Sequence, residues 1–314
     1  MPSTNWKTDN HKFVGKAFDF SYAERLNKLS PIMSEVTTRS VDYEIEGTGG
    51  YGELQQYDGT NLNHGKMSRG FKTIVRPQEF SKSIPVGYKQ AKIDKRGETK
   101  KVGTRLGASA AATVYLHMLR CFARAWAPTY LGGDGKPWAA ADHPVASKGS
   151  NERKFIVDEE AGTYSNVMSS AFSVSAITAA QTMANRLITP DGLPLLAEFD
   201  TVLISPELEP KAKRFFGESS RLMPLRDPEN DHNAANPIYG MKYIVIGGGM
   251  DGFRGEQWAV CDRKMLREVL NLIYITKPCV MQSELDNPLI DMYTAYVDFG
   301  VGWGDARPII FSRV

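Results

Sequence analysis

Hydrophobic and polar positions repeat with different periods along the chain, and the changes of period outline its parts. The first forty residues are mostly polar and include one apolar, helix-like patch at Phe18–Leu29, which ends at Ser30-Pro31. From Val41 to about Ile93 the pattern is extended, with strand-like segments at 41–45 and 71–75. The sequence therefore predicts a polar arm followed by the two strands of a ribbon.

Glycine is concentrated between these two strands. The glycines of this stretch are Gly47, Gly49, Gly50, Gly52, Gly59, Gly65 and Gly70. A two-stranded ribbon is marginal in water, and one with few side chains to pack is weaker still. We call residues 41–75 the flap, and we expect it to need contacts with a partner.

The strongest helical pattern lies at Glu98–Ala127. It is rich in alanine, contains no proline before Pro128 and repeats apolar residues at helical spacing. These residues are Leu116, Leu119, Ala123 and Trp126, and Tyr115 and Phe122 widen the stripe. Such a run extends about 45 Å at 1.5 Å per residue, and we expect Gly97, Gly103 and Gly107 to shorten it.

The second half of the chain predicts a mixture of helices and strands. After a loop at 130–170, Ser173 or Ser175 can cap a helix that Pro190-Asp191-Gly192 stops. The apolar face of this helix consists of Ile177, Ala180, Ala184 and Leu187. Strand candidates follow at 201–204, 243–246, 258–261, 272–275 and 291–301, with a short helix at 211–216. Because regular strand–helix–strand spacing is missing, we assign the fold class α+β.

Composition narrows the class of protein. The chain has 314 residues, 42% of them hydrophobic, and can bury a core, while a formal net charge of +2 creates no overall field toward nucleic acid or an anionic membrane. No apolar run approaches the ~18 residues of a membrane span. Cys121, Cys261 and Cys279 form no paired motif, so we expect small core residues in a reducing cytoplasm.

One motif suggests an enzyme that binds a nucleotide. A strand pattern at 243–246 runs into Gly247–Gly252, which reads G-x-G-x-x-G. That motif holds a dinucleotide only if a helix begins at its last glycine, because the helix N-terminus supplies the amide donors. Here the following residues, 258–261, read as another strand. A glycine-rich loop between strands is the better interpretation, and the nucleotide-binding enzyme remains as an alternative.

Other chemistry is weakly supported. The five histidines have no second histidine or cysteine at metal-ligand spacing, and the common hydrolase and phosphate-loop motifs are missing. His143 follows Asp142, a pairing that invites a general-base role, but a loop histidine held by local hydrogen bonds is the more frequent case. We therefore predict no catalytic residue, no cofactor and no metal.

A basic stretch offers a third interpretation. Between Lys82 and Arg105 the chain has eight basic residues and two acidic ones. The ordinary explanation is a solvated or subunit-facing surface, and the alternative is a DNA-binding module that contacts phosphates. The candidate phosphate or subunit contacts are Lys95, Arg96, Lys100 and Lys101.

The order of these parts, together with three local motifs, resembles the major capsid proteins of tailed bacteriophages with the Hong Kong 97-type fold. The segment 134–144, DGKPWAAADHP, is similar to the DGxxLFSxxHP segment of Mu-like major head proteins, although Trp138 replaces the usual leucine and Asp142 a small residue. The stretch from Pro190 to Glu209 is similar to "D..G.P" followed by "L.VPP.LE". The tail at 293–303 fits a long strand of that fold.

This resemblance implies a division into named regions. They are an N-terminal arm (1–40), an E-loop hairpin (41–95), a P-domain with its spine helix (96–172), an A-domain (173–279) and a return to the P-domain (280–314). It also implies that E-loops lie over neighbouring subunits, which agrees with our expectation that the flap and the extended arm are stabilised only by burial against another chain. The implied inter-subunit contacts are Tyr51, Leu54, Lys66, Arg69 and Lys72, and Lys66 or Lys72 could serve a covalent cross-link.

The resemblance also implies a function and partners. The chain would assemble with itself as pentamers and hexamers into an icosahedral or prolate head that encloses double-stranded DNA, which it contacts weakly and without sequence specificity. We expect a separate scaffold protein or none, since the arm begins near Met1, together with a portal and a decoration protein. The expected location is the virion, after assembly in the bacterial cytoplasm and with no membrane.

Overall fold

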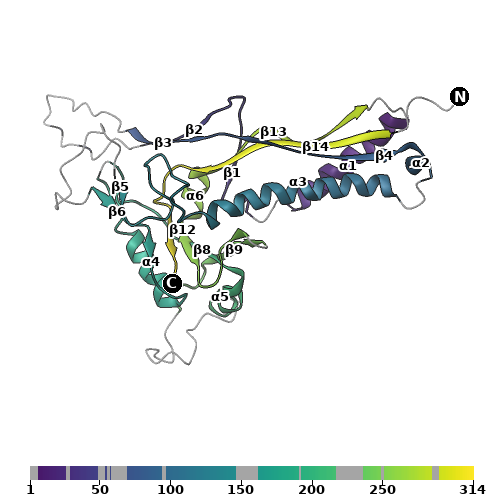
Figure 1. Cartoon of the computed structure of the whole chain (residues 1–314). Coiled ribbons are helices and arrows are strands. Elements are labelled where there is room, and N and C mark those ends of the chain that lie inside the picture. The colour runs from purple at the N-terminus through teal and green to yellow at the C-terminus, as the bar shows by residue number, and fades with distance from the viewer. Residues whose placement is uncertain are drawn as a thin grey trace. The chain divides into compact units, whose positions relative to one another are not determined.

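A computed structural model describes residues 6–25, 29–48, 54, 57, 69–93, 97–145, 162–190, 192–216, 236–248, 251–284 and 290–314. The chain divides into two compact units (Figure 1). The first unit combines Met1–Tyr43, Val75–Met118 and Asn271–Val301, and the second combines Glu44–Ile74, Leu119–Leu270 and Gly302–Val314. Each unit is therefore built from segments that are far apart in the sequence.

The first unit contains a four-stranded sheet in the order β1-β13-β14-β4. Its strands are β1 (Ser34–Thr37), β13 (Leu270–Glu284), β14 (Ile290–Trp303) and β4 (Gln78–Gly87). The predicted strand at 272–275 is part of the much longer β13, and the predicted strand at 291–301 is β14. Tyr293, Ala295 and Val297 alternate with more exposed residues along β14 and bury one face of the sheet.

The predicted long helix is present in this unit as α3 (Glu98–Ala123) and lies along the long strands (Figure 1). Its 26 residues make it about 39 Å long. Gly97, with φ +65°, precedes its first residue, as expected for a glycine that bounds a helix. The prediction that Gly103 and Gly107 shorten the helix is wrong, because α3 runs through both.

The N-terminal region differs from the prediction as well. Helix α1 (Trp6–Arg25) begins well before the apolar patch and ends before Leu29. Its buried residues Val14 and Phe18 share a core with Leu106 of α3 and Tyr293 of β14. The expectation that the arm depends on another copy of the chain for burial is therefore wrong for this helix. A short helix, α2 (Tyr88–Lys92), follows β4.

The two glycines inside α3 explain this packing. A Cβ atom at Gly103 would overlap the carbonyl oxygen of Val14, and one at Gly107 would overlap that of Phe18. Glycines four residues apart lie on one face of a helix, so they open a smooth strip that lets a second backbone approach closely. The pair forms a seat for α1, which we call the glycine seat (Gly103 and Gly107).

The second unit is organised around a five-stranded mixed sheet in the order β7-β15-β12-β8-β9. The strands are β7 (Val167–Met168), β15 (Ile309–Ser312), β12 (Trp258–Cys261), β8 (Thr201–Ile204) and β9 (Lys242–Val245). The strands predicted at 201–204, 243–246 and 258–261 are confirmed, whereas β15 was not predicted. Parallel and antiparallel pairs with separate helices agree with the α+β class.

Helices pack on this sheet. Helix α4 (Val174–Ala184) begins at Ser173, whose hydroxyl oxygen accepts a hydrogen bond from Ala176 N at 3.1 Å, and the predicted apolar residues Ile177, Ala180 and Ala184 are buried. A 3-10 turn, η2 (Pro206–Leu208), leads into α5 (Glu209–Phe216). Helix α6 (Arg263–Val269), which was not predicted, is capped by Asp262.

Two-stranded pairs of short strands are also described. Strand β2 (Tyr43–Thr48) pairs with β3 (Arg69–Val75). Strand β5 (His143–Pro144) pairs with β6 (Thr163–Tyr164), and β10 (Gly247–Gly248) pairs with β11 (Asp251–Gly252).

Candidate subunit-contact site

The base of the flap is a two-stranded ribbon joined by backbone pairing and by one partly exposed ion pair, with Ile45 and Val75 as buried apolar residues. Strands β2 and β3 pair as predicted, and a Cβ atom at Gly70 would overlap the carbonyl of Gly47, so only glycine fits there. The Lys72 Nζ lies 2.5 Å from the Glu44 Oε2, and both side chains are about half exposed. Such an ion pair contributes less than about 1 kcal/mol. The ribbon therefore has little stabilisation of its own.

A tight turn at Gly132–Gly135 contacts strand β3 within the second unit. The backbone N–H of Gly133 donates a hydrogen bond to Thr73 Oγ1 at 2.9 Å, and a Cβ atom at Gly133 would overlap the carbonyl of Lys72. Gly304 lies against Ile45 in the same way, where a Cβ atom would be 2.7 Å from Ile45 Cγ2. The base of the flap is thus fixed at close range by glycines of two separate segments.

The segment DGKPWAAADHP, which carried the most specific resemblance, has a structural role. His143 is fully buried, and its Nδ1 lies 2.6 Å from the Asp134 Oδ2. The imidazole also stacks on Tyr164, with ring centroids 5.2 Å apart. The prediction of a histidine held by local hydrogen bonds is confirmed, but the partner is Asp134. Asp142 pairs with Lys136 instead.

Arg307 connects the same cluster to two other segments. Its guanidinium donates to the carbonyl of Ile188 at 2.9 Å, to Asp305 Oδ2 at 2.8 Å and to the carbonyl of Val145. It also lies over the Tyr164 ring, 4.8 Å from the centroid. A buried cation with this many partners is satisfied and fixes loops in place. We call Asp134, His143, Tyr164, Asp305 and Arg307 the clasp.

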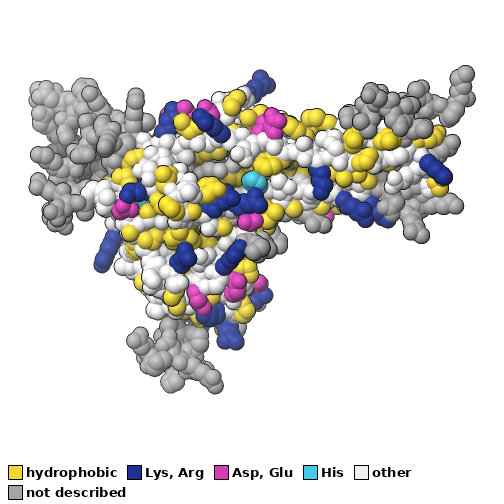
Figure 2. Space-filling model, viewed as in Figure 1, with side chains coloured by type: hydrophobic (Ala, Val, Ile, Leu, Met, Phe, Trp, Pro, Cys, Tyr) yellow, Lys and Arg dark blue, Asp and Glu magenta, His cyan; other side chains and the backbone are white. Residues whose placement is uncertain are grey.

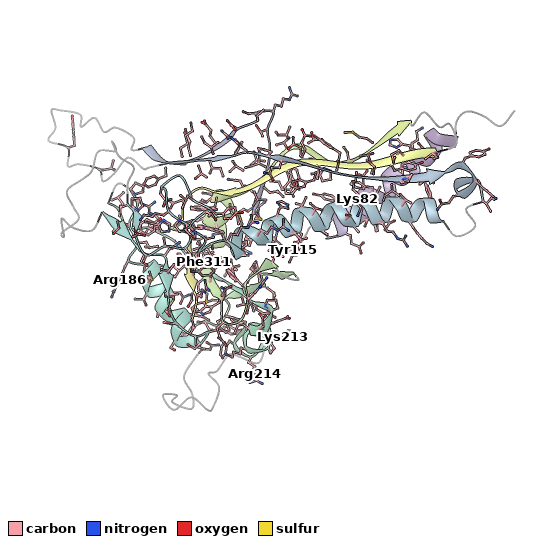
Figure 3. All side chains as sticks on the ribbon, in the orientation of Figure 1. Lys82, Tyr115, Arg186, Lys213, Arg214 and Phe311 are labelled. Carbon is pink, nitrogen blue, oxygen red and sulfur yellow. The ribbon has the colours of Figure 1, made fainter. Side chains whose placement is uncertain are left out.

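Aromatic packing lies next to the clasp. Trp138 is buried and stacks on Trp303, with centroids 5.7 Å apart and planes at 12°. Phe122 and Phe311 contact the same indole at 5.2 Å each. Figure 3 labels Phe311 among the side chains of the strands in this unit. Trp138 therefore fills the core position that the resemblance assigns to leucine.

The structure describes only some of the predicted contact residues. Leu54 is 93% exposed, and Lys72 is paired with Glu44. Arg69 begins strand β3. Tyr51 and Lys66 lie outside the described residues, and so do Lys95 and Arg96. Among the predicted contact residues that the structure describes, Arg69 and Lys72 lie on one strand.

The described part of the basic stretch is distributed over two elements. Lys100 and Lys101 belong to α3, and Lys101 is exposed. Lys82 is an exposed residue of β4 and is labelled in Figure 3. On the face shown in Figure 2, lysine and arginine side chains are spread out and interspersed with acidic ones rather than gathered in one patch. This distribution agrees with the modest net charge.

The glycine-rich motif does not form a nucleotide site. Gly247–Gly248 and Asp251–Gly252 pair as antiparallel strands, and strand β12 follows after a turn. No helix begins at Gly252, so the amide donors that a pyrophosphate requires are missing from this position. The prediction of a loop between strands is confirmed. Glycine is required at two positions of the motif for structural reasons. Gly252 has a φ of +97°, and a Cβ atom at Gly247 would overlap Pro206.

Reactive groups are also scarce among the described residues. Burial raises the pKa of the Cys121 thiol to about 12 and that of Cys261 well above its usual range, so neither is a thiolate at neutral pH. Within the described residues no group of three or more histidine, cysteine or acidic side chains could hold a metal ion. None of the helices described is both long and apolar enough to cross a bilayer.

The fold of this chain is similar to that of solved capsid and particle structures. The capsid of an empty GTA particle matches with a TM-score of 0.54 and 10% identity over 91% of this chain and 88% of that chain. The capsid of Ralstonia phage GP4 matches with a TM-score of 0.53 and 10% identity, over 90% of this chain and 86% of that chain. A virus-like particle from Pyrococcus furiosus matches with a TM-score of 0.52 and 9% identity, over 96% and 99% of the two chains. The chain has the Hong Kong 97-type capsid fold.

The capsid fold confirms the fold class that the sequence predicted. No family model and no curated protein matches the sequence. Identities near 10% mean that the likeness lies in the fold rather than in conserved side chains. Within this capsid fold, sequence reasoning missed the glycine seat and Arg307 of the clasp. The signal for the glycine seat was the four-residue spacing of Gly103 and Gly107. The signal for Arg307 was a single arginine between an alanine and an apolar run.

Proposed function

We propose that this chain is a major capsid protein, a structural subunit without enzymatic activity that assembles with many copies of itself into a closed shell around packaged double-stranded DNA. The observation that carries the proposal is the fold likeness to shell-forming subunits over about nine tenths of both chains. The flap agrees with it, because its base is fixed within the second unit while Leu54 is 93% and Tyr57 is 60% exposed. Contact with a neighbouring subunit would remove these apolar side chains from water, which is favourable.

In the proposed shell, each segment would take the role that the resemblance implied. The flap would be part of the E-loop (41–95), α3 the spine helix of the P-domain, and residues 173–279 the A-domain. Tyr51, Leu54, Lys66, Arg69 and Lys72 would contact the adjacent subunit within pentamers and hexamers. A scaffold protein, a portal and a decoration protein would be further partners, the shell would form in the host cytoplasm, and Lys66 or Lys72 would be the candidate for a covalent link.

Electron microscopy of the purified full-length protein, alone and with its scaffold, tests this proposal. We expect closed particles, rings or tubes for the natural sequence. A variant in which a short Gly-Ser linker replaces residues 51–66 keeps β2 and β3, and it should fold as a monomer that forms no closed shell. Its circular dichroism and denaturant unfolding should match those of the natural chain. Closed shells from the shortened variant, or a natural chain that stays monomeric under all these conditions, would contradict the proposal.

Contact with packaged DNA belongs to the same proposal. Lys101 and Arg105 are exposed on α3, and a protein that neutralises phosphates with such side chains binds DNA with a steep dependence on salt. We expect weak duplex binding whose salt dependence decreases when Lys100 and Lys101 are changed to glutamate. Replacement of Lys211 and Lys213 of α5, which pair with Glu256 and Glu209, is the matched control and should have a smaller effect.

A further inference from the structure

Two carboxyl groups face each other across the long sheet of the first unit. In the antiparallel register of β4 and β14, Glu79 lies directly opposite Asp298. Side chains at directly opposite positions point to the same face, with their Cβ atoms about 4.5–5.5 Å apart. Two ionised carboxylates at this distance repel each other, so the pairing is unfavourable unless one of them is neutral.

Burial makes the pairing more unfavourable. Asp298 is only 7% exposed, and its Oδ1 is buried without a hydrogen-bond partner. A buried, ionised oxygen without a donor carries a large desolvation cost, whereas a protonated carboxyl group does not carry that charge and can itself donate. Burial, followed by the charge of Glu79, raises the pKa of Asp298 above its usual range.

The described surroundings of the pair include a tyrosine hydroxyl group. The Tyr296 hydroxyl, from β14, hydrogen-bonds to the Glu79 carboxyl group, and burial raises the pKa of Tyr296, with smaller contributions from Glu79, Asp298 and Cys279 of β13. Helix α3 contributes His117, but this imidazole packs on Phe80 and Phe299, which are sequence neighbours of the two acids and therefore point to the opposite face. No lysine or arginine is among the causes of the Asp298 shift.

We propose that the Glu79–Asp298 pair carries one proton, on Asp298, and that loss of this proton loosens strand β4 from β14. Strand β4 is an edge strand, and among the described strands of this sheet it pairs with β14 alone. Repulsion at one position of the ladder therefore acts on a strand that is held by a single neighbouring strand. The pair would make the order of this edge depend on pH.

The direction of the effect follows from proton linkage. An acid whose pKa is higher in the folded state than in the unfolded state binds more protons when folded. Its stabilising contribution is present below the unfolded pKa of about 4 and is lost as the pH rises through the folded pKa. Strand β4 should therefore become less protected at higher pH, opposite to the behaviour of an acid in an ion pair.

Hydrogen exchange of the full-length, unassembled protein, followed by mass spectrometry from about pH 4 to about pH 8, tests this proposal. Protection factors for 78–87, corrected for the intrinsic exchange rate, should fall with rising pH in the natural chain. The substitutions Asp298→Asn and Glu79→Gln each remove one ionisable group and preserve shape. Either should abolish the pH dependence and raise the protection of β4 severalfold at the upper end of the range.

The matched control is Glu35→Gln, which removes an exposed carboxylate from β1 of the same sheet and should leave the pH dependence unchanged. Equal protection of β4 at every pH in the natural chain would overturn the proposal, and so would an unchanged pH dependence in Asp298→Asn. If Asp298→Asn fails to fold, Glu79→Gln at the exposed partner decides. Because the experiment uses unassembled chains, its result is independent of whether shells form.

Discussion

Helix α1 and the flap both lie in the part of the chain for which the sequence predicted a polar arm and a ribbon, but the structure supports them differently. Helix α1 has a seat within its own unit, where Val14 and Phe18 are completely or almost completely buried. The flap has a fixed base, formed by β2 and β3, whereas Leu54 and Tyr57, which lie between these strands in the sequence, are exposed. Glycine accounts for both outcomes. On α3 it removes side chains from a strip that another helix covers, and in the flap it removes side chains that could have packed.

The most damaging change to the α1 side of this comparison should be Phe18→Ala. Phe18 is 1% exposed in the core shared with α3 and β14, so its removal leaves a cavity and should lower the free energy of unfolding by about 3–5 kcal/mol. Denaturant unfolding of the unassembled chain measures it. The control is Phe20→Ala on the same helix, where the side chain is 74% exposed and the change should stay within about 0.5 kcal/mol.

Equal effects of these two substitutions would mean that α1 is not docked on α3 in solution. The helix would then be an arm that depends on another copy of the chain, as the sequence pattern first indicated.

Glycine itself supplies the second test. In Gly107→Ala the added methyl group would overlap the carbonyl oxygen of Phe18, so α1 and α3 must move apart. We expect the free energy of unfolding to fall by about 1–3 kcal/mol, although alanine has the better helix propensity. Gly15→Ala is the matched control, because Gly15 is in α1 and a Cβ atom there meets nothing within 4 Å. That change should stabilise the protein by about 0.5–1 kcal/mol. Thermal unfolding of both variants separates the glycine seat from simple propensity, and a stabilising Gly107→Ala would contradict the seat.

Elements could be predicted from the sequence where a local periodic pattern determines them. They were predicted poorly where packing against a distant segment of the chain determines their bounds. The alanine-rich helix, the Ser173 cap and strand β14 follow from local pattern, and all three are confirmed. The bounds of α1 could not be predicted, because its burial depends on two glycines of α3 that look locally like helix breakers. Likewise, Asp134 and His143 are visible as a local motif, but Arg307 joins them only through tertiary structure.

The smallest expected effect concerns the base of the flap. Replacing Lys72 with alanine breaks its ion pair with Glu44, but both groups are about half exposed, so the free energy of unfolding should fall by less than about 1 kcal/mol and the difference should shrink at high salt. Thr73→Val removes the hydroxyl that receives the Gly133 N–H, and it should cost about 1 kcal/mol with no dependence on salt. A salt series of denaturant unfolding distinguishes the two. If Lys72→Ala cost more than Thr73→Val at every salt concentration, charge rather than the glycine turn would fix the flap, and the contrast drawn with α1 would have to be revised.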